Sequence, residues 1–466
     1  MTDAEARVRT RYWLFVLPFV LAFIIWLWYP VVAEAIILYA FKHKPVFQPT
    51  SWLWYAAALF LYSWYTWIVI GFGGVFIVAA WHWRNRETRK GPKNYPGISF
   101  VIPAFNEERL ISRCLLSLLK CSAKYLGRSE IIVVDDGSTD FTYETAWSTF
   151  AKYQRYVPQT RGKVIRHTGN LGRAEAIRTG LNKAMMENVC VVDADSWWEL
   201  DTLSELINFI NGESTSAVTG YIHPTDGKRE HNLFVVFQQQ EYSHSLAVFR
   251  CAQALHNAVF IVPGPIGLQE ANNMREILNE RTTRSVTEDM EVTLEMQKRG
   301  IGVSYAENAH SVTIAPTSLS MFWNQRLRWF TGGLHNLLGI HRGMLFTKTW
   351  VSLLLWYSLI VEYGGAILEV GALFGLPLLY WFAPDRTFFL YNVLTFLILV
   401  LVVGAVYQAI ALKFAYNQFN HGKLLLYMPL YLVLRFINVS ARFRCLITYA
   451  FGDRGSWRKA ERPMLS

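Results

Sequence analysis

The chain has 466 residues, of which 52% are hydrophobic and only 17% are charged. About a quarter of the residues in an ordinary soluble domain are charged, so this composition argues against a wholly soluble protein. Much of the net charge of +10 at pH 7 lies beside apolar stretches, which favours contact with anionic lipid and argues against nucleic-acid binding.

Two apolar stretches near the start of the chain, residues 12–40 and 52–83, contain almost no charged side chains. About 20 apolar residues suffice to cross a bilayer, so residues 1–83 are predicted to form two transmembrane helices. The first stretch is too long for the apolar part of a cleaved signal peptide, and we interpret it as a retained anchor. Basic residues precede the first stretch and follow the second, and the positive-inside rule places these flanks in the cytosol.

Residues 84–317 have the composition of a soluble domain and are predicted to lie in the cytosol. Short β-branched runs alternate with helical stretches, which indicates a Rossmann-like α/β domain with right-handed βαβ units and a mostly parallel sheet. Such sheets bind ligands beyond the carboxyl ends of their strands. The predicted strands are 97–105, 130–135, 163–167 and 189–193, and the predicted helices are 107–119, 140 onward and 173–186.

Pairs of carboxylates lie at the ends of two of these predicted strands. Asp135 and Asp136 begin the run DDGSTD, and Asp193 and Asp195 flank a single alanine. Two carboxylates one residue apart can converge on a hard divalent cation, Mg²⁺ or Mn²⁺, whose open positions take phosphate oxygens. For the first pair, an ordinary aspartate-rich turn before a helix is the alternative.

A third acidic site is Thr287-Glu288-Asp289, at the start of the predicted helical stretch 289–300. Acidic residues are favoured at the positive end of a helix, and this capping role is one interpretation. The other interpretation is that Asp289 acts as a general base. The residues themselves leave both interpretations open.

Residues 318–345 are predicted to form amphipathic interface helices, with a break near Gly332-Gly333. The side expected to lie on the bilayer consists of Leu319, Trp323, Arg326, Phe330 and Leu334. The side expected to face the cytosolic domain consists of Gln325, Arg328 and Trp329. Arginine can pair with phosphate oxygens and tryptophan can stack on a sugar ring, whereas ordinary anchoring at the membrane interface is the alternative.

The C-terminal apolar region, residues 346–450, contains two predicted spans at 350–383 and 387–412 and a third apolar stretch at 424–450. The number of crossings stays open because three arginines interrupt the third stretch. The basic tail, residues 451–466, favours a cytosolic C-terminus. Glu362 and Glu369 lie seven residues apart on one helical face, toward either a polar exit path or a neighbouring helix.

Six short motifs follow one another along the chain. They are VIPAFNEE (101–108), VVDDGSTD (133–140), HTGNLGRAEA (167–176), DADS (193–196), TED (287–289) and QRLRW (325–329). Over residues 97–335 this order resembles the family 2 glycosyltransferases, which have a GT-A fold. It looks most like their membrane-embedded, processive branch, the cellulose, chitin, hyaluronan and poly-N-acetylglucosamine synthases.

The resemblance implies roles for the matching residues. The nucleotide and donor sugar would be bound by Pro103, Asn106, Glu107, Asp135, Asp136, Arg173, Asp193, Asp195 and Arg328. Asp193 and Asp195 would also hold the metal, and Asp289, with Glu288 beside it, would be catalytic. The acceptor would contact Gln325, Trp329 and Gly264. Arg173 stands where relatives commonly have lysine, and the segment PGPIG (263–267) departs from the family's usual wording.

On this resemblance the chain would be an inverting, processive polysaccharide synthase, multi-pass in the cell membrane. It would transfer sugar from a UDP-sugar, with UDP-N-acetylglucosamine or UDP-glucose favoured, to a growing β-linked glycan, coupled to export. One alternative is a non-processive enzyme that adds a single sugar to a lipid acceptor. The other is a transporter or scaffold with a degenerate nucleotide-binding domain. Any accessory subunit is left open.

Overall fold

The structure is a computed structural model that describes residues 73–84, 95–210, 215–227, 232–280, 285–382, 386–415, 424 and 426–453. The first predicted span, most of the second and nearly all of the basic tail fall outside the described residues. The described residues comprise a sheet domain and a group of long helices.

The strands are β1 (Ile98–Ala104), β2 (Ser129–Asp135), β3 (Thr160–Arg166), β4 (Asn188–Val191), β5 (Ser196–Trp198), β6 (Ala217–Thr225), β7 (Gly267–Glu270) and β8 (Val303–Ile314). The α-helices of the sheet domain are α4 (Ile111–Lys124), α5 (Thr142–Tyr153), α6 (Arg173–Lys183), α7 (Thr202–Ile207), α10 (Ala271–Glu280) and α11 (Glu288–Lys298). The remaining α-helices are α3 (Gly73–Arg84), α8 (Leu233–Tyr242), α9 (Arg250–Ala254), α12 (Leu319–His335), α13 (Trp350–Tyr357), α14 (Gly365–Phe382), α15 (Arg386–Ala415) and α17 (Met428–Ala450). Short 3₁₀ segments are η3 (Gln154–Tyr156) and η6 (Arg342–Phe346), and π-helical segments are η4 (Ser243–Phe249), η5 (Asn336–Ile340) and η7 (Ser358–Gly364).

The sheet has eight strands in the order β3-β2-β1-β4-β7-β6-β8-β5. The four strands predicted from the sequence, β1 to β4, pair in parallel. Every residue of β2 is buried, as expected for a central parallel strand covered on both faces. The other half is mixed, because β7 runs antiparallel to β4 and β6, and β5 runs antiparallel to β8. The prediction of a mostly parallel sheet holds for β1 to β4 and for the pairing of β6 with β8, and it was wrong for β5 and β7, which run antiparallel to their neighbours.

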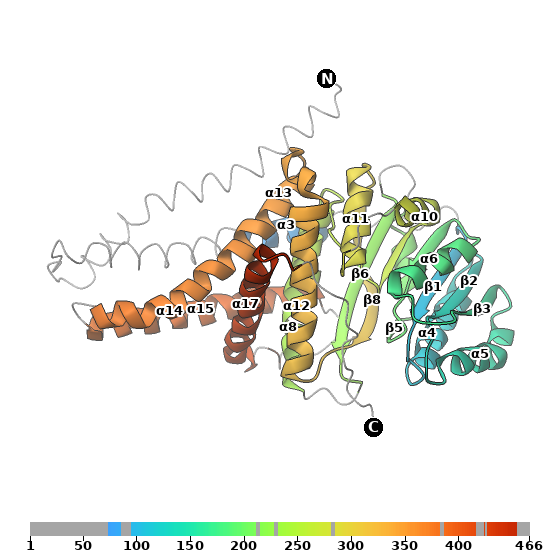
Figure 1. The fold of residues 1–466 in the computed structure, drawn as a ribbon, viewed down its shortest axis with the longest axis horizontal. Coiled ribbons are helices and arrows are strands. Elements are labelled where there is room, and N and C mark those ends of the chain that lie inside the picture. The colour runs from blue at the N-terminus through green and yellow to red at the C-terminus, as the bar shows by residue number, and fades with distance from the viewer. Residues whose placement is uncertain are drawn as a thin grey trace, which may run out of the picture.

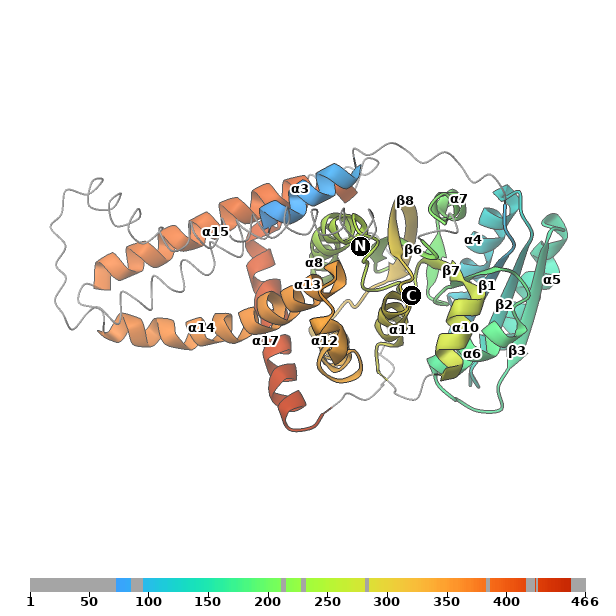
Figure 2. The same cartoon turned by 90° about the horizontal axis from the view of Figure 1, so that it is seen from above.

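Helices cover both faces of the sheet, as Figures 1 and 2 show. Helices α4 and α7 lie on one face, and α6 and α10 lie on the other. Helix α12 stands between the sheet domain and the long helices, and it packs along α17. In Figure 1, α14 and α15 extend away from the sheet domain. Most of the buried hydrophobic residues form one core that reaches from the sheet to α12, and smaller separate clusters lie between β2 and α6 and between α8, α12 and α17.

Helix α12 runs unbroken through Gly332-Gly333, where the sequence predicted a break. Ser318 precedes the helix, and its hydroxyl accepts a hydrogen bond from the Met321 N–H (3.4 Å). A Cβ at Gly332 would lie 2.5 Å from Thr287 Oγ1, so this glycine permits close contact with the segment that contains TED. The prediction was wrong because the glycine serves packing between two distant segments and not a turn.

The side of α12 predicted to lie on the bilayer packs against protein instead. Phe330 and Leu334 are buried, and Arg326 is only 1% exposed. Arg326 donates to Glu241 of α8 at 2.6 Å, a partner that the local helical spacing does not reveal. Leu319, in the first turn, is exposed.

Among the described residues, one helical run, Trp350–Leu378, is long enough and apolar enough to cross a membrane. Helix α15 covers the next predicted span. Two ion pairs join the first run to α17: Glu369 with Arg435, and Glu362 with Arg442 at 3.6 Å. This pairing supports the neighbouring-helix interpretation of both glutamates.

Candidate functional site

The predicted donor residues gather at the carboxyl edge of the parallel strands. Pro103 lies in β1 beyond Val101, the last residue paired with β4, so its missing N–H removes no hydrogen bond from that pairing. Asn106 follows β1 with a positive φ of 56°. Its side-chain oxygen accepts the Thr139 N–H at 2.8 Å, and this bond fastens the loop after β1 to the loop after β2. Glu107 is buried beside them, and its N–H donates to Thr142 Oγ1 at 2.7 Å.

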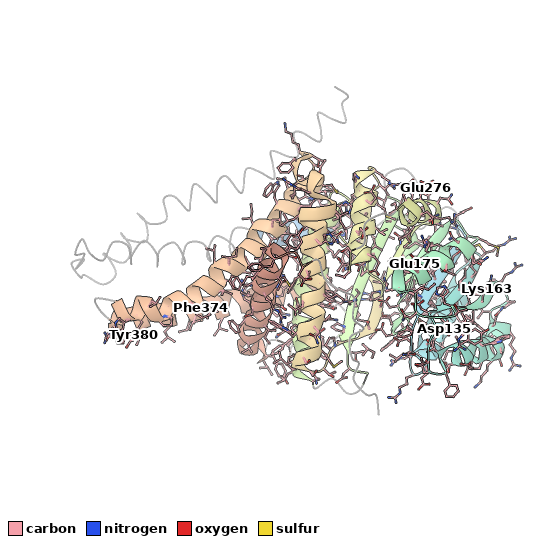
Figure 3. The ribbon with its side chains drawn as sticks, viewed as in Figure 1. Asp135, Lys163, Glu175, Glu276, Phe374 and Tyr380 are labelled. Atoms are coloured by element: carbon pink, nitrogen blue, oxygen red, sulfur yellow. The ribbon has the colours of Figure 1, made fainter. Side chains whose placement is uncertain are left out.

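Asp135 and Asp136 have protein partners. Asp135 is fully buried, accepts the Ser138 N–H at 3.0 Å and pairs with Arg166 at 3.2 Å. Figure 3 labels Asp135 within the sheet domain. Asp136 accepts the N–H groups of Leu171 and Gly172 at 2.9 and 2.8 Å. Asp136 thus anchors the loop that leads into α6, and direct donor contact by either aspartate stays a prediction.

Three motifs far apart in the sequence meet at Arg173, the first residue of α6. Its Nη2 and Nε donate to Asp193 Oδ1 at 2.7 and 3.2 Å, and its Nη1 donates to the Glu288 carboxylate. Burial alone would lower the pKa of Arg173, but the charge of Asp193 and its hydrogen bond outweigh burial and raise that pKa. The structure therefore brings together an arginine and two carboxylates that the sequence placed in separate motifs.

Gly264 lies directly against this ion pair. A Cβ at this position would be 2.2 Å from Arg173 Nη2 and 2.4 Å from Asp193 Oδ1. Its carbonyl oxygen also accepts the Asp193 N–H at 3.0 Å. The glycine in PGPIG is thus required by the close approach of charged side chains, and any contact with an acceptor stays a prediction.

Asp289 lies near the same cluster, in the first turn of α11. Burial raises the pKa of its carboxyl group above the ordinary value, although the cations of Arg173 and Arg328 act in the opposite direction. The capping interpretation also has support, because Asp289 Oδ1 accepts the N–H of Met290 in the first turn of α11 at 2.8 Å. A carboxyl group whose pKa burial raises, and on which two arginine cations act, has the properties of a base candidate.

Arg328 reaches this region from α12. Burial lowers the pKa of its guanidinium, and the charges of Asp289, Asp193 and Asp195 oppose that effect. Asp195 is half-buried after β4, and its Oδ1 accepts the hydroxyl of Ser196 at 3.2 Å. Across the described ranges, no group of three or more histidine, cysteine, aspartate or glutamate side chains could hold a metal ion. Asp193 and Asp195 alone would leave most coordination positions to a ligand.

A small, partly open pocket adjoins the cluster. Arg173, Gly264, Glu288 and Asp289 line it at the polar end. Its apolar lining comes from Ile177, Val191, Val262, Met274, Leu278 and Val292. The charged lining residues suit a ligand with phosphate and hydroxyl groups.

The other two predicted acceptor residues, Gln325 and Trp329, lie on α12. Both are half-buried. Gln325 Oε1 is buried and, within the part of the chain that the structure describes, accepts no hydrogen bond. The guanidinium of Arg326 lies 4.4 Å from the centre of the Trp329 ring. A buried carbonyl oxygen without a donor next to a supported indole ring is suited to a hydroxyl-rich ligand.

The sequence did not predict two sets of residues that hold α12 in place. Glu241 binds Arg326 with one carboxylate oxygen and accepts Asn438 Nδ2 of α17 at 3.1 Å with the other. Asn336, just after α12, donates to Thr287 Oγ1 at 3.0 Å and so ties α12 to TED. A run of three glutamines followed by a glutamate, in FQQQEYSHSLAVF (237–249), is an available signal for the first set. No local pattern marks Asn336.

Two family models match the chain. "Glycosyl transferase family 2" matches residues 99–261, and "Glycosyl transferase family group 2" matches residues 188–407. Together they cover the sheet domain, α12 and most of the long helices. Both therefore include the Arg173, Asp193 and Asp289 region or part of it.

The chain is similar to two curated staphylococcal proteins, each called poly-beta-1,6-N-acetyl-D-glucosamine synthase. It is 26% identical to the Staphylococcus aureus (strain COL) protein over 268 residues, which are 57% of this chain and 61% of that one. It is 28% identical to the Staphylococcus epidermidis protein over 243 residues, or 52% of this chain and 56% of that one. The chain thus spans about three fifths of the length of these relatives.

A solved structure shares the fold. It is a mannosyltransferase from Pyrobaculum calidifontis in complex with GDP-Man and Mn²⁺. The match has a TM-score of 0.56 at 18% identity and covers 78% of this chain and 100% of that chain. The two family models and the curated relatives show that the chain is a glycosyltransferase with family 2 sequence features, and the solved structure shows that its fold is shared.

Proposed function

We propose that the chain transfers a sugar from a nucleotide-diphosphate donor to a growing glycan, with Asp289 as the base. The observation that carries this proposal is the position of Asp289, whose carboxyl pKa burial raises, close to Arg173, Arg328 and Asp193. A base must accept a proton at working pH, and a raised carboxyl pKa brings it closer to that task. Glu288 is paired with Arg173 and supports the site instead of acting as a second base.

The reaction needs one displacement. Asp289 takes the proton of an acceptor hydroxyl, the hydroxyl oxygen attacks the anomeric carbon, and the bond to the nucleoside diphosphate breaks. Arg328 stabilises the negative charge that the departing diphosphate gains. Attack opposite the leaving group inverts the anomeric centre, so an α-linked donor gives a β-linkage.

Asp193 and Asp195 suit a divalent cation, Mg²⁺ or Mn²⁺. Both are half-buried carboxylates at the carboxyl end of β4, and hard oxygen ligands match either ion. The ion, when bound, would neutralise charge on the donor diphosphate. The Mn²⁺ and GDP-Man in the solved mannosyltransferase support a cation and a nucleotide sugar for this chain too.

The donor and acceptor follow from the relatives and from α12. We favour UDP-N-acetylglucosamine or UDP-glucose as donor, because the curated relatives are named poly-N-acetylglucosamine synthases. Gln325 would bind acceptor hydroxyls through its unpaired oxygen, and Trp329 would stack on the terminal sugar of the chain. Such a platform retains the product for repeated addition, which favours processive extension.

The site would work at the cytosolic face of a membrane. Large apolar side chains of α14, among them Phe374, Leu378 and Trp381, are exposed. Figure 3 labels Phe374 and Tyr380 on the end of α14 that lies away from the sheet domain. Contiguous exposed apolar surface requires a covering, and lipid would cover these helices. We therefore retain a multi-pass organisation, with residues 84–317 cytosolic and export coupled to synthesis.

A donor panel tests the proposal. Full-length enzyme in detergent would receive UDP-glucose, UDP-N-acetylglucosamine, UDP-glucuronate or GDP-mannose, each with Mg²⁺ or Mn²⁺, and nucleotide release and product length would be measured. We expect release from one UDP-sugar and a long β-linked product. Release from GDP-mannose alone would overturn the UDP assignment, and a product of one sugar on lipid would support the non-processive alternative.

A further inference from the structure

Arg173 occupies a carboxylate that a divalent cation also needs. Both Nε and Nη2 of its guanidinium donate to one oxygen of Asp193, and Nη1 binds Glu288. The side chains of Arg173 and Asp193 are 20% and 29% exposed, so water does not separate them freely. Two charge-assisted bonds on a single oxygen leave that oxygen poorly available to a metal ion.

The surroundings hold this pair in place. A Cβ at Gly264 would lie 2.2 Å from the Arg173 guanidinium and 2.4 Å from the Asp193 carboxylate, so only glycine leaves room for this ion pair. The backbone at Gly264 thus packs directly against the ion pair and helps to hold it in place. Arg178, on the same helix, instead pairs with Glu175 near the surface.

Glu288 gives the guanidinium a second partner. A buried arginine that lost its one carboxylate would be strongly disfavoured, because an unpaired charge would remain in a site with little water. Arg173 can release Asp193 and stay paired with Glu288, whose side chain is 13% exposed. When a divalent cation replaces Arg173 as the partner of Asp193, Arg173 therefore still has a carboxylate partner.

We propose that Arg173 is a resident counter-ion for Asp193 that competes with the divalent cation and moves aside when the cation and donor bind. This inference rests on the proposed metal role of Asp193. Arg173 then sets the cation affinity of the empty enzyme: it weakens binding of the ion alone, so that the ion binds mainly together with the donor diphosphate.

The test is Mn²⁺ binding to the full-length protein without nucleotide, by titration calorimetry or by the signal of free Mn²⁺ in electron paramagnetic resonance. Arg173→Gln should bind Mn²⁺ about tenfold more tightly than the wild type, the order expected when one charge-assisted competitor is removed. Arg328→Gln is the matched control: Arg328 acts on Asp193 through charge, and within the described part of the chain Asp193 receives its guanidinium hydrogen bonds from Arg173. Arg178→Gln, which changes a near-surface charge on the same helix, should leave Mn²⁺ binding unchanged.

Two results would overturn the inference: unchanged or weaker Mn²⁺ binding by Arg173→Gln, or an increase no larger than that of Arg328→Gln. If Arg173→Gln fails to fold, Arg173→Lys replaces it. Its single ammonium cannot bridge two carboxylates with the same geometry, so it should also bind Mn²⁺ more tightly than the wild type. Failure of the proposed function would appear differently, as absence of nucleotide release by the wild type from every donor.

Discussion

The donor half and the acceptor half of the site are built in different ways. Most of the donor residues lie at or just after the carboxyl ends of β1, β2 and β4, so the parallel sheet brings them to one edge by topology. The acceptor half is α12, which is held by contacts to α8 and α17 across long sequence separations. Positions set by strand order can be anticipated from motifs, whereas positions set by helix packing depend on single buried partners.

The largest expected effect is in the acceptor half, at Arg326. Arg326→Gln leaves Glu241 without its cation in a mostly buried position, and this should lower stability by about 3 kcal/mol. Thermal unfolding of the detergent-solubilised protein measures it. Arg178→Gln breaks an ion pair that is far more exposed and should cost less than about 1 kcal/mol. Equal losses for the two variants would contradict the difference between the halves.

The matching change in the donor half is Asp136→Ala. It removes the acceptor for the N–H groups of Leu171 and Gly172, and we expect a stability loss of about 2 kcal/mol. Because the loop 167–172 leads into Arg173, donor binding should weaken as well. Limited proteolysis within this loop and calorimetric UDP binding give the two measurements. Unchanged cleavage and unchanged UDP affinity would remove the anchoring role of Asp136.

The connection between the halves is tested by Gly332→Ala. The added methyl group would meet Thr287 Oγ1 at 2.5 Å and push α12 from TED, at a cost of about 1–2 kcal/mol. The rate of sugar transfer should fall by more than the loss of folding stability alone would cause, because Asp289 lies two residues after Thr287. Gly343→Ala, where a Cβ meets nothing within 4 Å, is the control and should leave transfer and stability unchanged. Normal transfer by Gly332→Ala would mean that the two halves are not coupled there.

The smallest expected effect is a shift in pH dependence. Arg328 lowers the pKa of Asp289 against the raising effect of burial, so Arg328→Gln should raise that pKa further. The base is active only when deprotonated, and the acid limb of kcat/KM should therefore move to higher pH. A pH profile compared with that of Arg178→Gln measures the shift. A limb that stays in place or moves to lower pH would argue against Asp289 as the titrating base.

The sequence predicted β1 to β4 within a few residues, because apolar runs between helical stretches have few alternative arrangements. It could not predict the mixed half of the sheet, where β5, β7 and β8 follow no regular alternation. It also assigned Arg326 to the bilayer, because helical spacing groups residues by side without identifying what covers that side. The ion pair of Arg173 with Asp193 joins residues 20 positions apart that only the folded sheet brings into contact.

Asp289→Asn tests the central claim most directly. The full-length wild type and variant would be compared for UDP release with the preferred donor, and for UDP binding by calorimetry. We predict that transfer falls by about 10²–10⁴-fold, the range for loss of a general base, while UDP binding is unchanged. Transfer at the wild-type rate by Asp289→Asn would contradict the assignment of Asp289 as the base.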